Sequence, residues 1–206
     1  MHDLAAGVAH FQQDVFPTKA GLFARLATTH RPHTLFIGCS DARVVPELIT
    51  QQEPGELFVI RTAGNLVPAY APGDEGVGAS IEYAVTALGV SSVVVCGHSA
   101  CGAMTALAEG HDLTDLPAVA RWLRHADASL ARSARSARSA RGAGGAGTDA
   151  AADRVGALIR DNVSAQLANL ATHPSVARAL AAGTLALHGW VYDIPTGTVE
   201  DFAPAA

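Results

Sequence analysis

The sequence has no apolar run that approaches the ~20 residues a helix needs to cross a bilayer. Cysteine is also scarce, and an odd count of three in 206 residues does not provide a disulfide framework. The chain starts without the basic and apolar segments of a secretory signal. We therefore expect a protein of the reducing cytoplasm that has no membrane partner.

Charged residues are also few. Charged residues make up 16% of the chain and the formal net charge is −5. A general nucleic-acid binder would be basic, so we expect no nucleic-acid partner. Apolar residues account for 49% of the sequence, which is enough for a packed core. The length fits one domain, and we expect a single domain over residues 1–206.

Two short motifs hold the residue types that carry chemistry. The first is Cys39-Ser-Asp41-Ala-Arg43, and the second is His98-Ser-Ala-Cys101. Two thiolates and one imidazole are typical zinc donors. Three protein ligands leave a fourth position for water, as in a catalytic rather than a structural zinc site.

Apolar runs alternate with helical patterns along the chain. Runs at 34–38, 57–60 and 93–96 predict strands buried on both faces of a parallel sheet, and helical patterns at 44–51, 77–88 and 101–108 follow them. This order predicts an α/β fold with a mostly parallel central sheet flanked by helices. A ligand site is then expected at the carboxyl ends of the strands, where Cys39 and His98 fall. Cys96 lies inside the third run, so a buried core position is favoured over a ligand role.

Three further segments complete the organisation. Residues 4–28 have helical spacing around Pro17 and predict an N-terminal helical arm over residues 1–28, packed either on its own core or on a neighbour. Residues 131–150 are of low complexity, with arginine at every third position at first, which places like charges at helical neighbours. A solvated linker is favoured there over a nucleic-acid contact, because no aromatic residues are interleaved.

A last strand at 185–192 is expected at an edge of the sheet.

The segments LFIGCSDARVVPELI, PGELFVIRTAGNLVPAY, GASIEYAV and VVVCGHSACGAM resemble the corresponding segments of β-class carbonic anhydrases. The similarity returns weakly at residues 185–193. It implies a zinc enzyme that interconverts CO2 and bicarbonate, with release of a proton, by way of zinc-bound hydroxide. It also implies one Zn2+ per subunit, held by Cys39, His98 and Cys101, and a homodimer or higher homo-oligomer in which the N-terminal helix packs on a neighbouring subunit.

Asp41 lies two residues from a ligand on the same turn. Its carboxylate can bind zinc itself, closing the site, or accept a hydrogen bond from the zinc-bound hydroxide. Arg43 can clamp this carboxylate with two hydrogen bonds and so decide between these states. The alternative for the pair is a surface salt bridge of little energetic value.

The resemblance also implies a substrate approach. Phe58 and Tyr83 would line an apolar path for CO2, with Tyr83 coming from a partner subunit, while Val44 and Gly102 would shape its floor. Core packing explains Phe58 and Val44 equally well. Many open-site relatives carry a glutamine nine residues before the first cysteine. His30 occupies that position here and offers a group that titrates near neutral pH.

The sequence is closer to the open-site, plant-type and actinobacterial-like branch. Relatives that bicarbonate inhibits hold the anion with a tryptophan, an arginine and a tyrosine, and Phe36 stands at the tryptophan position here. Two alternatives to CO2 hydration remain open. One is hydrolysis of CS2 or carbonyl sulfide on the same fold, and the other is a non-catalytic zinc protein that serves as a partner or sensor.

Overall fold

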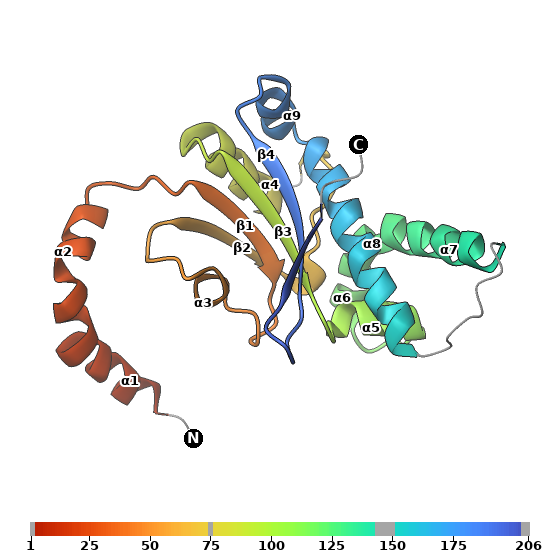
Figure 1. Cartoon of the computed structure of the whole chain (residues 1–206), viewed down its shortest axis with the longest axis horizontal. Coiled ribbons are helices and arrows are strands. Elements are labelled where there is room, and N and C mark those ends of the chain that lie inside the picture. The colour runs from red at the N-terminus through yellow and green to blue at the C-terminus, as the bar shows by residue number, and fades with distance from the viewer. Residues whose placement is uncertain (1–2, 74–75, 143–150, 203–206) are drawn as a thin grey trace. The chain divides into compact units, whose positions relative to one another are not determined.

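The structure, a computed structural model, describes residues 3–73, 76–142 and 151–202. The chain divides into two compact units, Met1–Arg31 and Pro32–Ala206. The larger unit contains a central sheet with helices packed against it (Figure 1), which confirms the predicted α/β fold. None of the described helices is both long enough and apolar enough to span a membrane.

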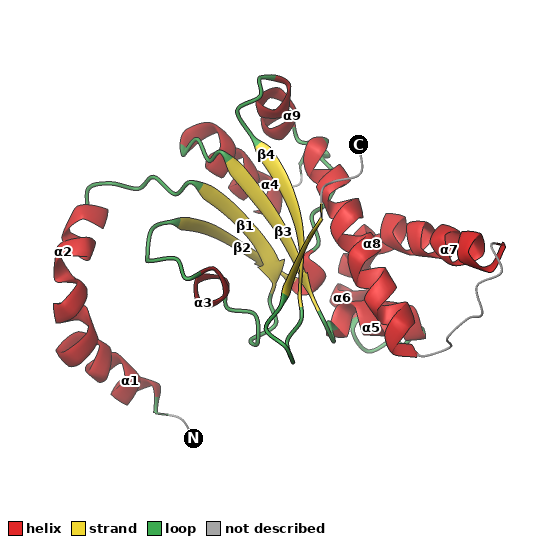
Figure 2. Cartoon of the chain, viewed as in Figure 1, coloured by secondary structure: helices red, strands yellow, loops and turns green. Residues whose placement is uncertain are grey.

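Five strands form one sheet in the order β2-β1-β3-β4-β5 (Figure 2). They are β1 (Thr34–Cys39), β2 (Leu57–Thr62), β3 (Ser92–His98), β4 (Ala186–Tyr192) and β5 (Val199–Phe202). The first four strands pair in parallel, and β5 pairs antiparallel with β4. The mixed sheet is as predicted, but its antiparallel edge strand is β5. The strand expected at the edge is β4, which lies inside the sheet beside β3.

The helices of the larger unit follow the predicted alternation with the strands. Their bounds are α3 (Pro46–Thr50), α4 (Gly76–Glu82), α5 (Gly102–Glu109), α6 (Pro117–Leu123), α7 (Asp127–Gly142), α8 (Ala151–Ala171) and α9 (Pro174–Ala181). Shorter turns are the 3-10 helices η2 (Ala63–Asn65) and η4 (Arg124–Ala126) and the π-helical turn η3 (Tyr83–Ala87).

Alternation along the strands divides the core between the two faces of the sheet. Leu35 and Ile37 of β1 are fully buried and belong to the core that includes residues of α4, α8 and α9. Phe36, between them, points to the opposite face, where it packs with Val94 and Trp190. A groove of about 540 Å³ lies over these three residues. The groove is not lined by Cys39, His98 or Cys101, the residues of the predicted metal site.

The prediction of a linker over residues 131–150 is wrong for residues 131–142, which belong to helix α7. Residues 143–150 lie outside the described part of the chain. Alanine at every third position favours a helix, and Arg132 and Arg135 both interact electrostatically with Asp161 of α8. The half-buried Asp161 carboxylate therefore offsets part of the like-charge repulsion on which the linker prediction relied.

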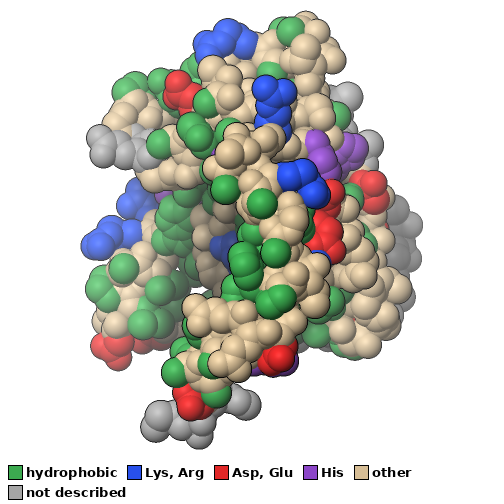
Figure 3. Space-filling model, turned by 90° about the vertical axis from the view of Figure 1, so that its left-hand side faces the viewer, with side chains coloured by type: hydrophobic (Ala, Val, Ile, Leu, Met, Phe, Trp, Pro, Cys, Tyr) green, Lys and Arg blue, Asp and Glu red, His purple; other side chains and the backbone are tan. Residues whose placement is uncertain are grey.

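The smaller unit corresponds to the predicted arm. It comprises α1 (Leu4–His10), the π-helical turn η1 (Phe11–Val15) and α2 (Phe16–Leu26), with Pro17 in the first turn of α2. Asp3 caps α1 by accepting hydrogen bonds from two backbone N–H groups of its first turn. None of these three helical segments contains a buried residue. Hydrophobic side chains are visible on the surface of the arm in Figure 3.

Candidate metal centre

The three predicted metal ligands meet at the carboxyl ends of two neighbouring strands. Cys39 is the last residue of β1, and His98 is the last residue of β3. Cys101 follows one turn later and immediately precedes α5. The two sulfur atoms and an imidazole nitrogen all lie within 4.8 Å of one another, and all three residues are buried. The parallel order of β1 and β3 thus brings together two motifs that are far apart in the sequence.

Close packing just before His98 positions the end of β3. A Cβ atom at Gly97 would lie 2.9 Å from Cγ2 of Val163 and 3.0 Å from Cγ2 of Ile159, both on α8. With a larger residue here, either these side chains or β3 would have to shift. Glycine at position 97 therefore lets β3 pack closely on α8 just before His98.

The imidazole of His98 is oriented for ligation. Its Nδ1 lies 2.9 Å from the Ser99 carbonyl oxygen, and because a carbonyl only accepts, Nδ1 carries the proton. The Nε2 atom then presents a lone pair. It is fully buried and has no hydrogen-bond partner among the described residues. A buried acceptor without a partner is costly, and a bound metal ion would satisfy it. The residues present therefore fit a metal ion.

The two thiols affect each other's ionisation. The pKa of Cys39 is lowered to about 4, chiefly because the Cys101 thiol donates a hydrogen bond to its thiolate, with smaller contributions from the backbone N–H groups of Asp41 and Gly64. The same hydrogen bond and burial raise the pKa of Cys101. One thiolate thus forms readily beside one thiol. A divalent cation would favour ionisation of both, since metal ligation requires thiolates.

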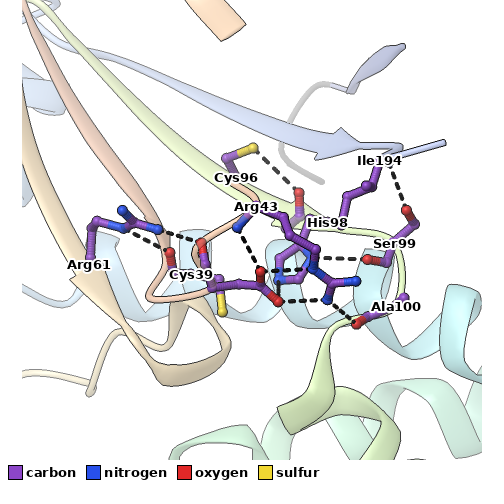
Figure 4. A network of polar contacts seen from close by, with 10 residues as sticks. Cys39, Arg43, Arg61, Cys96, His98, Ser99, Ala100 and Ile194 are labelled. Carbon is purple, nitrogen blue, oxygen red and sulfur yellow. Dashed lines mark hydrogen bonds and ion pairs between the residues drawn. The ribbon is translucent and has the colours of Figure 1, made fainter. Parts of the chain in front are cut away.

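Arg43 clamps the carboxylate of Asp41 with two side-chain hydrogen bonds. Figure 4 shows the Arg43 side chain close to His98 and Ala100. The Nε atom of Arg43 donates to Oδ1 at 2.9 Å and an Nη2 hydrogen donates to Oδ2 at 2.7 Å. The backbone N–H of Arg43 also donates to Oδ1 at 2.9 Å. These bonds hold the pKa of Asp41 well below its usual range. Asp41 Oδ2 lies 3.8 Å from His98 Nε2, so the clamped carboxylate directly borders the metal ligands.

Three hydrogen bonds to backbone carbonyls, which the sequence did not predict, hold this arrangement in place. Arg43 Nη2 also donates to the Ala100 carbonyl at 3.1 Å, and Ala100 has a left-handed conformation with φ of 54°. Arg61 of β2 donates from Nε to the Cys39 carbonyl at 3.0 Å and from Nη2 to the Asp41 carbonyl. No sequence signal marks Ala100, because its contribution is a backbone oxygen.

Cys96 lies apart from the three ligands, on the other face of the sheet. It is fully buried and packs in the cluster that contains Phe36 and Val94. Burial raises the pKa of its thiol to about 12. Its S–H group donates to the Gly97 carbonyl. The thiol of Cys96 therefore has the environment of a core residue.

Two of the predicted substrate-binding residues adjoin the ligands. Val44 is fully buried, and its N–H donates to the Asp41 carbonyl at 3.0 Å. Gly102 directly follows Cys101 and is the first residue of α5. Both positions are therefore next to the site along the chain. His30 belongs to the first unit of the chain, and its proximity to the site stays a prediction.

The other two predicted substrate-binding residues lie elsewhere in the sheet. Phe58 pairs with Leu35, four residues before Cys39 on β1, which corresponds to ~13 Å along a strand. Tyr83 is half-exposed, and its ring centroid lies 6.0 Å from that of Phe58. The two rings form a pair, but Phe58 is not beside the metal ligands of its own chain.

Comparison with known proteins agrees with this geometry. The family model for carbonic anhydrase matches residues 34–199. A carbonic anhydrase of Pseudomonas aeruginosa is 56% identical over 200 residues, covering 97% of this chain and 86% of the relative. The solved β-carbonic anhydrase CcaA superposes with a TM-score of 0.86 at 38% identity, covering 98% of this chain and 91% of that one.

A further solved structure comes from work on two tetrameric β-carbonic anhydrases of the filamentous ascomycete Sordaria macrospora. It superposes with a TM-score of 0.75 at 32% identity, covering 97% of this chain and 91% of that one. The similarity in sequence and in fold therefore extends over nearly the whole chain and includes both ligand motifs. The chain belongs to the carbonic anhydrase family, as an enzyme of the β class that hydrates CO2.

Proposed function

We propose that the chain carries out the reversible hydration of CO2 to bicarbonate and a proton with one zinc ion bound by Cys39, His98 and Cys101. The observation that carries this proposal is the convergence of three buried donor atoms within 4.8 Å beside a clamped carboxylate. Two thiolates and one imidazole suit zinc better than calcium or magnesium, which prefer oxygen ligands. When bound, zinc would lower the pKa of a water molecule from ~15.7 toward ~7, so that hydroxide is available near neutral pH.

The chain's own residues orient the reaction. Asp41 is close enough to the ligand cluster to accept a hydrogen bond from the reacting water. Arg43 engages both carboxylate oxygens of Asp41 and so keeps this carboxylate from serving as a fourth ligand. In this role Asp41 aligns the water for attack on the carbon of CO2. Release of Asp41 by Arg43 would close the site, so the pair can act as a switch.

The proposed substrate contacts come from two subunits. Val44 and Gly102 border the site within one chain, and we assign them to the floor of the CO2 approach. Phe58 and Tyr83 are assigned to the apolar wall of a site in a neighbouring subunit, because Phe58 is four ladder positions from its own Cys39. His30 is assigned to proton transfer or substrate orientation near the entrance.

The exposed apolar surface of the N-terminal arm supports an oligomer. Leu4 is 83% exposed, Val8 is 55% exposed, and the helical segments of the arm bury no residue. Such a surface is unfavourable in water unless another molecule covers it. We propose at least a homodimer, in which the arm of one copy packs on a second copy. The described tetrameric relatives support this proposal.

The free cysteine thiols support a proposal for the cellular location of the protein. All three cysteines are free, and two of them must be available as thiolates to hold the metal. A reducing compartment keeps such thiols from forming disulfides. We therefore propose that the enzyme works in the cytoplasm. We likewise propose that residues 1–206 act as one functional domain with the arm as its docking element.

One purified sample tests the function. Zinc content would be measured by elemental analysis, and hydration of CO2 would be compared by stopped flow with hydrolysis of CS2 and of carbonyl sulfide. We expect about one zinc per chain and a much higher rate with CO2. Faster turnover of a sulfur substrate would favour the alternative hydrolase. Bound zinc without turnover of any of the three would indicate a partner or sensor protein.

A further inference from the structure

Ser99 connects a candidate metal ligand to the turn that follows β4. It directly follows His98, the last residue of β3, and its carbonyl oxygen accepts the Nδ1 hydrogen of that imidazole at 2.9 Å. The Ser99 N–H donates to the Tyr192 carbonyl at 2.9 Å. The Ser99 hydroxyl oxygen accepts a hydrogen bond of 2.9 Å from the backbone N–H of Ile194, which it faces in Figure 4. All three polar groups of Ser99 are therefore in use.

The turn that carries Ile194 is held by its own hydrogen bonds. The Asp193 N–H donates to the Thr198 carbonyl at 2.8 Å, and the Gly197 N–H donates to the Asp193 carbonyl at 2.9 Å. The Asp193 carboxylate accepts hydrogen bonds from the N–H and the hydroxyl of Thr196, at 3.0 and 2.6 Å. Gly197 has a left-handed φ of 71°, which glycine adopts without strain. The turn therefore presents the Ile194 N–H in a fixed direction.

The peptide that contains the Ser99 carbonyl is also held from its other side. Ala100 has a φ of 54°, which is uncommon for a residue with a Cβ atom, and its carbonyl accepts a hydrogen bond of 3.1 Å from Arg43 Nη2. The backbone is thus fixed after this peptide by Arg43 and before it by the N–H and hydroxyl of Ser99. Rotation of the peptide plane would turn the Ser99 carbonyl away from His98 Nδ1.

We infer that the Ser99 side chain is a positioning residue for the metal centre. By accepting the Ile194 N–H, its hydroxyl holds the Ser99 carbonyl against His98 Nδ1 and so fixes the direction of the Nε2 lone pair. This inference rests on the proposed ligation by His98. The Nε2 atom is buried and has no hydrogen-bond partner among the described residues, so the hydrogen bond at Nδ1 sets the orientation of the ring.

The physical reason is the way in which proteins orient histidine ligands. A histidine that binds a metal ion through one ring nitrogen donates the hydrogen of the other nitrogen to a fixed acceptor, which sets the tautomer and makes the ligating nitrogen more basic. Loss of such a partner typically changes metal affinity or activity by about 10- to 100-fold. Ser99→Ala keeps the carbonyl but frees it to move, so we expect an effect at the lower end of this range.

A purely structural role of the Ser99 hydroxyl predicts a loss of stability alone, because the hydroxyl joins the end of a strand to a turn. Thr172, which directly follows α8, offers a matched control. Its hydroxyl also accepts a backbone N–H from a distant segment, that of Tyr70, at 2.8 Å, and it donates to the Asn169 carbonyl at 2.6 Å. Thr172→Ala therefore removes the same kind of contact without changing the contacts of Ser99.

The experiment compares Ser99→Ala, Ser99→Thr and Thr172→Ala with the parent as full-length proteins. Zinc affinity would be measured by competition with a chromophoric chelator. In protein with 15N-labelled histidine, NMR would follow both ring nitrogens of His98 and the rate at which its Nδ1 hydrogen exchanges with solvent. We expect Ser99→Ala to bind zinc ~10-fold more weakly and to exchange this hydrogen faster. Ser99→Thr, which keeps the hydroxyl, and Thr172→Ala should match the parent in both measurements.

Parent-like zinc affinity and hydrogen exchange in Ser99→Ala would overturn the inference, and so would equal losses in Ser99→Ala and Thr172→Ala. If Ser99→Ala does not fold, Thr196→Val tests the same contact from an exposed position, because it loosens the turn that carries Ile194. This variant should speed exchange of the Nδ1 hydrogen, and a parent-like rate would overturn the inference. If zinc leaves the Nε2 resonance of His98 in the parent unshifted, the proposed ligation fails instead, so the two failures are distinguishable.

Discussion

Arg43 and Asp41 form a two-pronged ion pair, in which the Nε–Oδ1 distance is 2.9 Å and the Nη2–Oδ2 distance is 2.7 Å. The Arg43 side chain is 51% exposed and the Asp41 side chain 18%. Exposed pairs usually contribute little to stability. This pair differs in its position, because Asp41 lies 3.8 Å from His98 and Arg43 is also bound to the Ala100 carbonyl. Its importance is therefore expected in activity rather than in folding.

Arg43→Ala should retain zinc but lose activity. Without the guanidinium, the Asp41 carboxylate is free to move onto the metal and to block the position that the reacting water needs. We expect CO2 hydration to fall by ~100-fold or more, the scale seen when a preorganised charge partner is lost. Stopped-flow rates and zinc content would be measured on the same samples.

A matched control is Arg160→Ala. Arg160 of α8 forms an ion pair of similar length with Glu200 of β5, in which Nε and Nη2 lie 2.9 and 2.8 Å from Oε2. This variant should keep the rate of the parent. Full turnover by Arg43→Ala with zinc still bound would show that Asp41 needs no restraint.

Cys101→Ala should lose most of its zinc, whereas Cys96→Ala should keep the metal content of the parent. Cys101 contributes one of three donor atoms within 4.8 Å. Cys96 is on the other face of the sheet, and burial raises the pKa of its thiol to about 12, which opposes thiolate formation. Elemental analysis after dialysis tests both. Zinc loss from the Cys96 variant instead would overturn the ligand assignment.

Asp161→Asn should stabilise the fold near pH 7. Burial raises the pKa of Asp161, against the opposing effect of Arg132, Ser133 and Arg135. A raised pKa in the folded state means that stability is fully present below the unfolded value of ~3.9 and is lost as pH rises. The asparagine variant avoids this loss. Urea unfolding of metal-free samples should show a gain at pH 7 that shrinks as the pH falls toward 4.

Asp112→Asn provides a control in which the expected change in stability at pH 7 has the opposite sign. The pKa of Asp112 is lowered by hydrogen bonds from the side chain and backbone of Thr114. Its contribution is present above the unfolded pKa and is lost as pH falls, so the variant should be less stable at pH 7. Destabilisation by Asp161→Asn at pH 7 would mean that its contacts with α7 outweigh the cost of burying its charge.

Removal of residues 1–28 should abolish the oligomer and leave protein that is aggregated or inactive. A milder test is Val8→Asp, which places a charge on an arm residue that is 55% exposed. Gln12→Asp introduces the same charge at an exposed polar position of the arm and should leave the assembly intact. Light scattering after size-exclusion chromatography measures each mass. A fully active monomer after truncation would contradict the proposed role of the arm.

The sequence predicted four of the five strands, and three of these, β1, β2 and β3, contain the continuous apolar runs that are typical of buried strands in a parallel sheet. The β5 strand was missed, since three of its four residues are exposed and its pairing partner is β4. Helix α7 was missed because local like-charge repulsion argued against it. The compensating carboxylate, Asp161, is on another helix and cannot be recognised from spacing.

The sequence by itself determined the candidate ligand set, because Cys39, His98 and Cys101 stand in short motifs of residue types that typically bind zinc. It also indicated the Asp41–Arg43 pair, whose two members are close enough along the chain to meet. Only the tertiary structure decided what surrounds them. The Ala100 carbonyl that accepts a hydrogen bond from Arg43 and the Cys39 carbonyl that accepts one from Arg61 are backbone groups, which every residue carries. These carbonyls meet the arginines only because the fold brings together segments that are distant in the sequence. No residue pattern could therefore predict these contacts.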